Sequence, residues 1–332
     1  MDRRGGKWGM LPGARLAQVL SATALAALAG LMAFGAAAAD AQYGAFGPEG
    51  PRLREQLWVV PGGDAATPLR ATLFRPASDG RRQPLVVINH GSDAATREAV
   101  AMPVFYWLSR WFVARGYAVL VPQRRGHGAT GGEFVEGRDS CTRTEHFEAA
   151  QAAADDIEAA VRFMQRQDFV DASRVVVAGT STGGWASLAV AGRPIPGLRL
   201  VVNFAGGRGG HAFGRPNVVC ARDKLIEAAG RLALGARVPS VWFYARNDSY
   251  FGPELASAMA AAWERNGGLA DLRLLPSYGA DGHDLVADRA SWPLWEGALS
   301  HHLEDAEIPG SSEPQPAEVV AATTPPPSSQ GR

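Results

Sequence analysis

The chain has 332 residues, 46% hydrophobic and 20% charged, which fits one large globular domain with extensions. Its 33 Lys and Arg residues balance 33 Asp and Glu residues, giving a formal net charge of zero, so neither nucleic acid nor an anionic membrane surface is indicated as a partner. The two cysteines, Cys141 and Cys220, do not have metal-ligand spacing, and no cofactor motif is present, so we expect neither a metal nor a cofactor.

The first 41 residues have the pattern of an export signal. A basic start is followed by an uncharged, alanine- and leucine-rich run over 16–39, and small residues offer cleavage after Ala39 or Ala41. The run is also long enough to span a bilayer, so an uncleaved anchor is the alternative; its high alanine content favours cleavage. We expect an exported protein, periplasmic or extracellular, that contacts a membrane only if this segment is kept.

The rest of the chain alternates between predicted strands and helices. Residues 42–52 are rich in Gly and Pro and are interpreted as a linker, and the apolar run 84–89 is typical of a parallel strand buried on both faces. Further strands are predicted at 53–60, 69–74, 117–121, 175–178, 198–204, 241–244 and 272–275, and helices at 96–115, 145–167, 185–191, 219–235, 253–263 and 292–303. The Pro- and Ser-rich tail, 306–332, is predicted to be disordered.

This alternation predicts an α/β domain over 53–305, with a mostly parallel central sheet covered by helices on both faces. In such sheets the loops at the carboxyl ends of the strands build the site. Ser181, Asp248 and His283 each fall just after a predicted strand. We therefore expect all three to project from one edge of the sheet.

Ser181 is the centre of a Gly-x-Ser-x-Gly motif that follows a buried strand and precedes a predicted helix. Gly179 and Gly183 leave room for a tight turn that exposes the serine hydroxyl; an ordinary glycine-rich turn is the alternative. The backbone N–H of Thr182 should face the position of a developing oxyanion, and the N–H of Ser92 is the expected second donor.

A serine nucleophile needs a base, and the base needs an acid that orients it. His283 follows the last predicted strand in a glycine-rich loop that can reach over Ser181. Asp248 follows the preceding strand and is the expected acid. Its competitors, Asp281 and Asp284, are too close in sequence to His283 to reach Nδ1 while the ring points at the serine.

Other side chains are candidates for supporting roles. His90 directly follows a strand and is expected to hold the oxyanion loop, while His127 and His211 lie in glycine-rich loops that can line a pocket. Four aromatic residues are interpreted as pocket walls or as core: Trp185, Phe204, Phe134 and Tyr250.

Export favours a disulfide between the two cysteines, because thiols pair in an oxidising compartment. Cys141 lies in a polar loop and Cys220 precedes a predicted helix. A disulfide between them would tie two loops over the same face of the sheet. Two unrelated buried thiols are the alternative.

Several motifs between about 84 and 285 occur together: His90-Gly91-Ser92, Arg124-Arg125-Gly126, Gly179-Thr180-Ser181-Thr182-Gly183-Gly184, Asn203-Phe204-Ala205-Gly206-Gly207, Asn247-Asp248 with Tyr250-Phe251, and Asp281-Gly282-His283. In these motifs the chain resembles the α/β-hydrolase superfamily and, within it, secreted bacterial members of the dienelactone hydrolase-like group. The resemblance implies an α/β-hydrolase fold with Ser181 as nucleophile, Asp248 as acid and His283 as base. True dienelactone hydrolases carry a cysteine nucleophile, so generic ester hydrolysis is the more plausible expectation.

We therefore expect a serine hydrolase that cleaves carboxylic esters of small or medium-sized molecules through an acyl-enzyme on Ser181. One alternative is a serine peptidase of the prolyl-oligopeptidase kind, which shares the turn and the order of the triad. Such peptidases usually carry a large extra domain, for which the stretch before residue 84 has no room. The other alternative is a non-catalytic binding protein on a hydrolase scaffold.

Overall fold

The computed structural model describes residues 43–92, 97–137, 141 and 143–306. All of them belong to one unit of the chain, which begins at Tyr43. The predicted export signal and, beyond Ala306, the predicted tail lie outside the described residues. Among the described residues, no helix combines the length and the apolar character needed to cross a bilayer.

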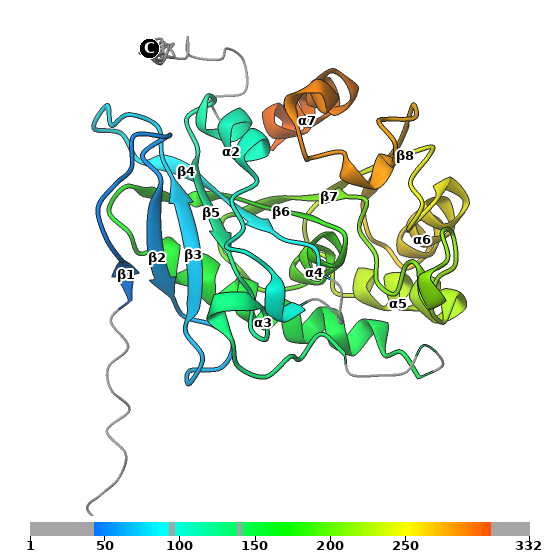
Figure 1. Cartoon of the computed structure of the whole chain (residues 1–332). Coiled ribbons are helices and arrows are strands. Elements are labelled where there is room, and N and C mark those ends of the chain that lie inside the picture. Colours follow the sequence, from blue (N-terminus) through cyan, green and yellow to red (C-terminus); the bar gives the residue numbers. More distant parts are fainter. Residues whose placement is uncertain (1–42, 93–96, 138–140, 142, 307–332) are drawn as a thin grey trace, which may run out of the picture. The chain divides into compact units, whose positions relative to one another are not determined.

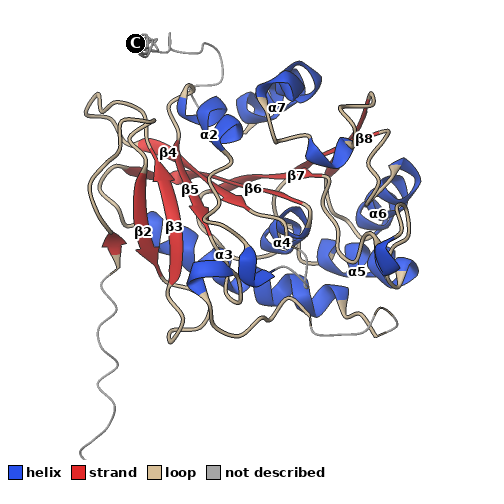
Figure 2. Ribbon diagram, viewed as in Figure 1, coloured by secondary structure: helices blue, strands red, loops and turns tan. Residues whose placement is uncertain are grey.

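A nine-stranded sheet forms the centre of this unit (Figures 1 and 2). Its strands are β1 (Gly44–Ala45), β2 (Gln56–Val60), β3 (Leu69–Phe74), β4 (Gln83–Asn89), β5 (Ala118–Pro122), β6 (Val170–Thr180), β7 (Leu198–Phe204), β8 (Ser240–Ala245) and β9 (Ala270–Leu275). Their spatial order is β1-β2-β3-β5-β4-β6-β7-β8-β9. The pairings from β1 to β5 are antiparallel and those from β5 to β9 are parallel, so the predicted mostly parallel sheet is confirmed.

Helices cover both faces of the sheet. They are α2 (Tyr106–Val113), α3 (His146–Met164), α4 (Thr182–Val190), α5 (Arg222–Ala233), α6 (Pro253–Arg265) and α7 (Trp292–Asp305). Single 3-10 turns lie at Arg97–Ala99, Gly128–Thr130, Ala212–Gly214, Gly282–Asp284 and Arg289–Ser291. The core of one face holds apolar side chains of α3, α4, α5 and α6, and the core of the other holds those of α2 and α7, as Figure 1 shows.

The buried strands explain why two separate cores form. Along β4, Leu85 and Val87 enter the core under α3 and α4, whereas Val86 and Ile88 enter the core under α2 and α7. Successive side chains of a strand point to opposite faces, and a strand covered on both faces is apolar throughout. This is the continuous apolar pattern that the sequence shows.

Differences from the predictions include the predicted helix 96–115 and the predicted linker 42–52. The predicted helix 96–115 begins only at Tyr106, because Pro103 interrupts a helical ladder and Phe105 adopts a left-handed conformation with φ of 38°. The predicted linker 42–52 contains β1, which pairs with β2 as the edge strand of the sheet.

Candidate active site

Ser181 occupies the turn between β6 and α4 with φ of 54° and ψ of −127°. A non-glycine residue in such a conformation costs about 1–3 kcal/mol and persists only where its surroundings fix it. Here the N–H of Ser181 donates to the carbonyl of Phe204 at 3.1 Å, and its carbonyl accepts from the N–H groups of Trp185 and Gly207. The strand β7 and the helix α4 therefore hold the strained serine with its hydroxyl in a cleft.

The glycines around Ser181 are required by close packing of backbones. A Cβ at Gly179 would lie 2.3 Å from the carbonyl oxygen of Gly183, and a Cβ at Gly183 would lie 2.2 Å from that of Asn89. A Cβ at Gly91 would lie 2.8 Å from the Cβ of Ser181. The loop after β4 can thus approach the serine only with glycine at position 91.

His283 and Asp248 form a pair beside this serine. Nδ1 of His283 lies 3.2 Å from each oxygen of the Asp248 carboxylate, whose side chain is fully buried. The same carboxylate accepts hydrogen bonds from the N–H groups of Tyr250 at 2.8 Å and Phe251 at 2.9 Å. Nδ1 of His283 thus faces Asp248, and Nε2 is the ring nitrogen that Asp248 does not engage. Ser181 lines the same cleft as His283.

Asp281 is engaged with the backbone rather than with the imidazole. Its carboxylate accepts from the N–H of His283 and the N–H of Ser249, both at 3.0 Å, and from the Ser249 hydroxyl. Burial alone would raise the pKa of Asp281, but these hydrogen bonds hold the pKa below its ordinary value. Asp281 thus fixes the loop that carries His283.

The two expected oxyanion residues, Ser92 and Thr182, lie close to each other in the structure. Ser92 and Thr182 line the cleft beside Ser181, and their hydroxyl oxygens lie 3.2 Å apart. The structure therefore brings the loop after β4 next to the first residue of α4.

His90 lies buried beneath this loop. Its Nε2 accepts from the N–H of Arg124 at 3.1 Å, which leaves Nδ1 as the protonated nitrogen, 2.9 Å from the carbonyl oxygen of Gly91. Burial, with the charge of Arg124 beside it, holds the pKa of His90 well below its ordinary value. Both nitrogens of the neutral imidazole are thus hydrogen-bonded. Through these bonds His90 holds the loop after β4, which is the role expected for it from the sequence.

A buried ion pair that was not predicted from the sequence joins Arg124 to Glu136, and Glu136 lines the cleft. The guanidinium of Arg124 binds both oxygens of Glu136, at 2.5 and 3.0 Å, and the two side chains are 0% and 5% exposed. Burial raises the pKa of Glu136, but Arg124 more than offsets this and the pKa is lowered. One signal was available, since a charged residue directly after a buried strand needs a buried partner.

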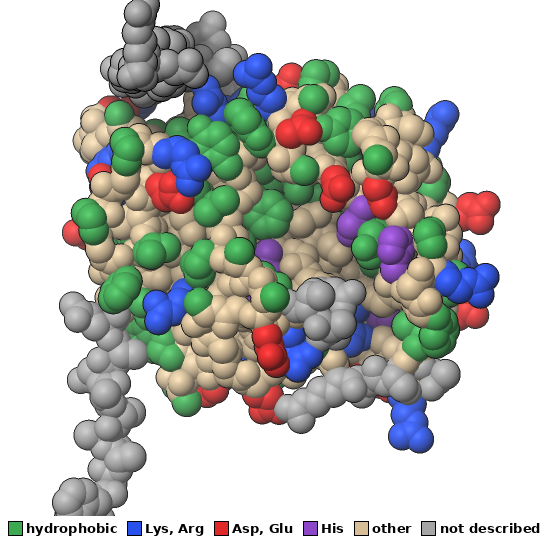
Figure 3. All heavy atoms as spheres, viewed as in Figure 1, with side chains coloured by type: hydrophobic (Ala, Val, Ile, Leu, Met, Phe, Trp, Pro, Cys, Tyr) green, Lys and Arg blue, Asp and Glu red, His purple; other side chains and the backbone are tan. Residues whose placement is uncertain are grey.

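The cleft has a volume of about 490 Å³, and Figure 3 shows a hollow on this face with histidine side chains around it. Phe134 and Tyr250 line the cleft, at positions expected for pocket walls. The cleft is also lined by Phe105, Arg208 and Val286, which were not predicted from the sequence. They come from loops whose paths no local pattern reveals.

The pocket-wall interpretation is wrong for Trp185 and Phe204. Trp185 is 1% exposed and faces α3, where its indole N–H donates to the carbonyl of His146 at 2.9 Å. Phe204 is fully buried on the opposite face of the sheet, stacked on Phe243 with ring centroids 5.1 Å apart. Both are core residues.

His127 and His211 do not line the cleft either; each packs against one of its aromatic walls. His127 is buried with its ring 5.3 Å from Phe134. His211 stacks on Tyr250 with ring centroids 3.6 Å apart.

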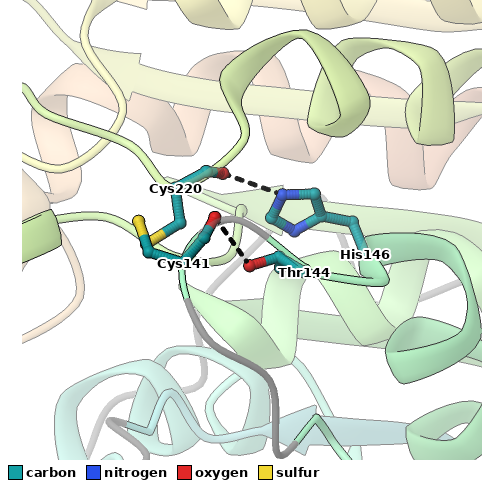
Figure 4. Close-up of a disulfide and its surroundings, with 4 residues drawn as sticks. All are labelled: Cys141, Thr144, His146 and Cys220. Atoms are coloured by element: carbon teal, nitrogen blue, oxygen red, sulfur yellow. Dashed lines mark hydrogen bonds between the residues drawn. A yellow bond between two sulfur atoms is a disulfide. The ribbon is translucent and has the colours of Figure 1, made fainter.

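A disulfide joins Cys141 to Cys220, so the predicted pairing is confirmed (Figure 4). Both cysteines line the cleft, and the bridge ties the segment after β5 to the segment before α5. The carbonyl of Cys220 accepts a hydrogen bond from Nε2 of His146 at 3.0 Å. Burial, helped by the charge of Arg208, lowers the pKa of this histidine to about 4.

Comparison with known proteins agrees with this architecture. Residues 103–196 match the prolyl oligopeptidase family, a stretch that includes Ser181 but neither Asp248 nor His283. No curated protein sequence matches the chain.

Solved structures share the fold at low sequence identity. A puromycin-hydrolyzing peptidase of Mycobacterium tuberculosis matches with a TM-score of 0.55 and 18% identity over 77% of this chain and 40% of its own. A dipeptidyl peptidase 4 of Porphyromonas gingivalis matches with a TM-score of 0.54 and 15% identity over 77% and 35%. An acetyl xylan esterase from Paenibacillus sp. R4 matches with a TM-score of 0.52 and 17% identity over 80% and 88%.

The chain thus spans less than half the length of the two peptidases and most of the length of the esterase. The sheet order, the strained serine after β6 and these likenesses agree, and the chain therefore has the α/β-hydrolase fold.

Proposed function

We propose that the chain is a serine hydrolase that cleaves carboxylic esters of small or medium-sized molecules through an acyl-enzyme on Ser181. One observation carries the proposal: a serine held at φ of 54° shares a cleft with a histidine bound to a buried aspartate. Strain of this kind, beside an acid–base pair, is a feature of nucleophiles rather than of ordinary turns.

The geometry supports the following steps. Nε2 of His283 takes the hydroxyl proton as Oγ of Ser181 attacks the acyl carbon, and Asp248 stabilises the imidazolium that forms. The N–H groups of Thr182 and Ser92 are proposed to bind the oxyanion. The imidazolium then protonates the departing alcohol, and a water molecule activated by His283 releases the acid from Ser181.

Peptide hydrolysis is the second candidate. The match of residues 103–196 to the prolyl oligopeptidase family favours it, and both peptidases named above share the fold. The acetyl xylan esterase, matched over most of its length, supports ester hydrolysis. Both reactions use the same acyl-enzyme chemistry, so only the leaving group distinguishes them.

A matched pair of substrate series separates the two candidates. We expect turnover of p-nitrophenyl esters of two to eight carbons, and no turnover of aminoacyl p-nitroanilides above that of the Ser181→Ala variant. Comparable kcat/KM values for anilides would instead establish a peptidase. If wild type hydrolyses neither series, the protein is not a hydrolase of either kind.

We also propose that the protein is exported, with residues 1–41 as its signal. The disulfide supports this, because such bonds persist in oxidising compartments. Expression in a bacterial host with fractionation tests the proposal: a periplasmic product whose N-terminus begins at Asp40 or Gln42 is expected, whereas an uncleaved membrane-bound chain would make the segment an anchor.

A further inference from the structure

We propose that Tyr250 is a positioning residue for the base His283, and that His211 holds Tyr250 in place; the inference rests on the proposed function. The imidazole of His283 stacks on the phenol ring of Tyr250, with centroids 4.2 Å apart and planes at 23°. The imidazole of His211 stacks on the same ring at 3.6 Å and 7°. At these distances the two imidazole rings cannot both lie on the same face of the phenol ring. The three rings therefore form a continuous stack with Tyr250 in the middle.

The acid alone fixes the base weakly. The hydrogen bond from His283 to Asp248 is long, and both carboxylate oxygens lie at the same distance of 3.2 Å. Such a contact holds one edge of the imidazole but leaves the tilt of its plane poorly determined. The flat face of Tyr250 removes this freedom and so sets the direction of Nε2, which must point at the serine oxygen for proton transfer.

A second path leads from His211 to the same loop. The Ser249 hydroxyl donates its only proton to Asp281, so at the 2.7 Å contact Nε2 of His211 must donate to the Ser249 oxygen. Asp281 in turn accepts the backbone N–H of His283 at 3.0 Å. The ring stack orients the imidazole, and this chain of hydrogen bonds fixes the backbone beneath it.

The segment that carries Tyr250 also holds the acid, through the N–H groups of Tyr250 and Phe251 on Asp248. Acid and base are thus oriented by one short stretch after β8. An aromatic ring at 250 is required for the stack.

The test compares Tyr250→Leu with Tyr250→Phe on a p-nitrophenyl ester. In Tyr250→Leu, kcat and the rate constant for fluorophosphonate labelling should both fall about three- to tenfold, the worth of one aromatic stack. Tyr250→Phe keeps the aromatic ring and should therefore lose less of both than Tyr250→Leu does. Circular dichroism and the thermal midpoint verify that each variant is folded.

Phe134→Leu is the matched control, because Phe134 is an aromatic wall of the same cleft that packs on His127 instead of His283. Its loss should raise KM more than it lowers kcat. If Tyr250→Leu shows this same pattern, Tyr250 is only a wall of the cleft and the proposal is wrong.

A double-mutant cycle tests the role of His211. On its own, the substitution His211→Ala should lower kcat. In the Tyr250→Leu background the same substitution should lower kcat by a smaller factor, because the effects of coupled residues are not additive. Fully additive losses would show that His211 does not act through Tyr250.

A readout independent of activity separates this inference from the proposed function. The ring of Tyr250 should shift the imidazole proton resonances of His283 upfield; they should move in Tyr250→Leu and stay in Tyr250→Phe, with His283→Gln providing the assignment. A wild type without turnover or labelling would refute the hydrolase proposal. An active wild type with an unmoved resonance in Tyr250→Leu would refute the stack.

Discussion

Arg124 is bonded to His90 twice: its backbone N–H donates to Nε2 at 3.1 Å, and its guanidinium donates to the carbonyl oxygen at 2.7 Å. The same guanidinium binds Glu136, whose backbone carbonyl accepts from Arg208 on the cleft wall at 2.7 Å. A buried charge pair therefore braces the loop that carries Ser92.

Arg124→Ala should lower the free energy of unfolding by about 3–5 kcal/mol, because it leaves the Glu136 carboxylate buried without its partner. Urea unfolding measures the loss. The double variant Arg124→Met with Glu136→Leu should recover much of the stability but not kcat, since the bond to the His90 carbonyl stays absent. Full recovery of kcat would show that the pair does not brace the loop.

The proposed second oxyanion donor, the backbone N–H of Ser92, can be removed by a single substitution. Ser92→Pro deletes the backbone N–H and should lower kcat about 10²- to 10³-fold, whereas Ser92→Ala keeps the N–H and should stay close to wild type. Steady-state kinetics on an activated ester gives both values. Equal losses in the two variants would point to the hydroxyl, and no loss in either would place the donor elsewhere.

Asp248 and Asp281 provide a matched pair of carboxylates around one histidine. Asp248→Asn should reduce kcat about 10⁴-fold, because the imidazole then loses the acceptor that sets its tautomer. Asp281→Asn alters the contacts to the N–H groups of His283 and Ser249 and to the Ser249 hydroxyl, none of which is a contact with the imidazole. Its effect on kcat should therefore be at least two orders of magnitude smaller. The reverse ranking of the two variants would make Asp281 the acid.

Stability should fall as the pH is lowered from about 6.5 to about 4. The pKa of His146 is depressed to about 4 in the fold, so in this range the unfolded chain binds the proton that the folded chain refuses. The lowered pKa of His146 corresponds to a decrease of about 3 kcal/mol in the free energy of unfolding over this pH range. His90, whose pKa is also lowered, contributes in the same direction.

Urea unfolding at several pH values checks this. His146→Asn, which keeps a side-chain donor for Cys220, should flatten the slope between those limits. An unchanged slope in that variant would assign the acid sensitivity to other groups.

Reduction of the Cys141–Cys220 bond should destabilise the fold. The bridge closes a loop with a sequence separation of 79. It therefore removes chain entropy from the unfolded state that corresponds to about 4.5 kcal/mol of stability. Unfolding with and without dithiothreitol measures the difference, and the double Cys→Ser variant controls for the reagent. Because both cysteines line the cleft, we also expect a higher KM; an unchanged KM would show that the bridge serves stability alone.

The sequence predicted the parts of this structure that local patterns determine. A buried parallel strand is apolar throughout, and a chain leaving its carboxyl end must emerge at one edge of the sheet, so Ser181, Asp248 and His283 could be placed together. A tight turn requires small residues on both sides of the serine, so the roles of Gly179 and Gly183 could also be predicted.

What the sequence did not predict depends on the paths of loops. The helix after Ser181 is apolar on all sides, so nothing in it tells whether Trp185 faces the cleft or α3. Likewise, the pairing of Arg124 with Glu136 and the stack of His211 on Tyr250 join residues through irregular segments, where no periodicity fixes the direction of a side chain.

Every step of the proposed reaction depends on Ser181 being a nucleophile that His283 activates. Labelling of the purified protein with a fluorophosphonate, followed by mass spectrometry of the peptides, tests it most directly. We predict one adduct, on Ser181, that disappears in Ser181→Ala and forms far more slowly in His283→Ala. No adduct, an adduct on another residue, or equal labelling of folded His283→Ala would show that Ser181 is not a nucleophile activated by His283.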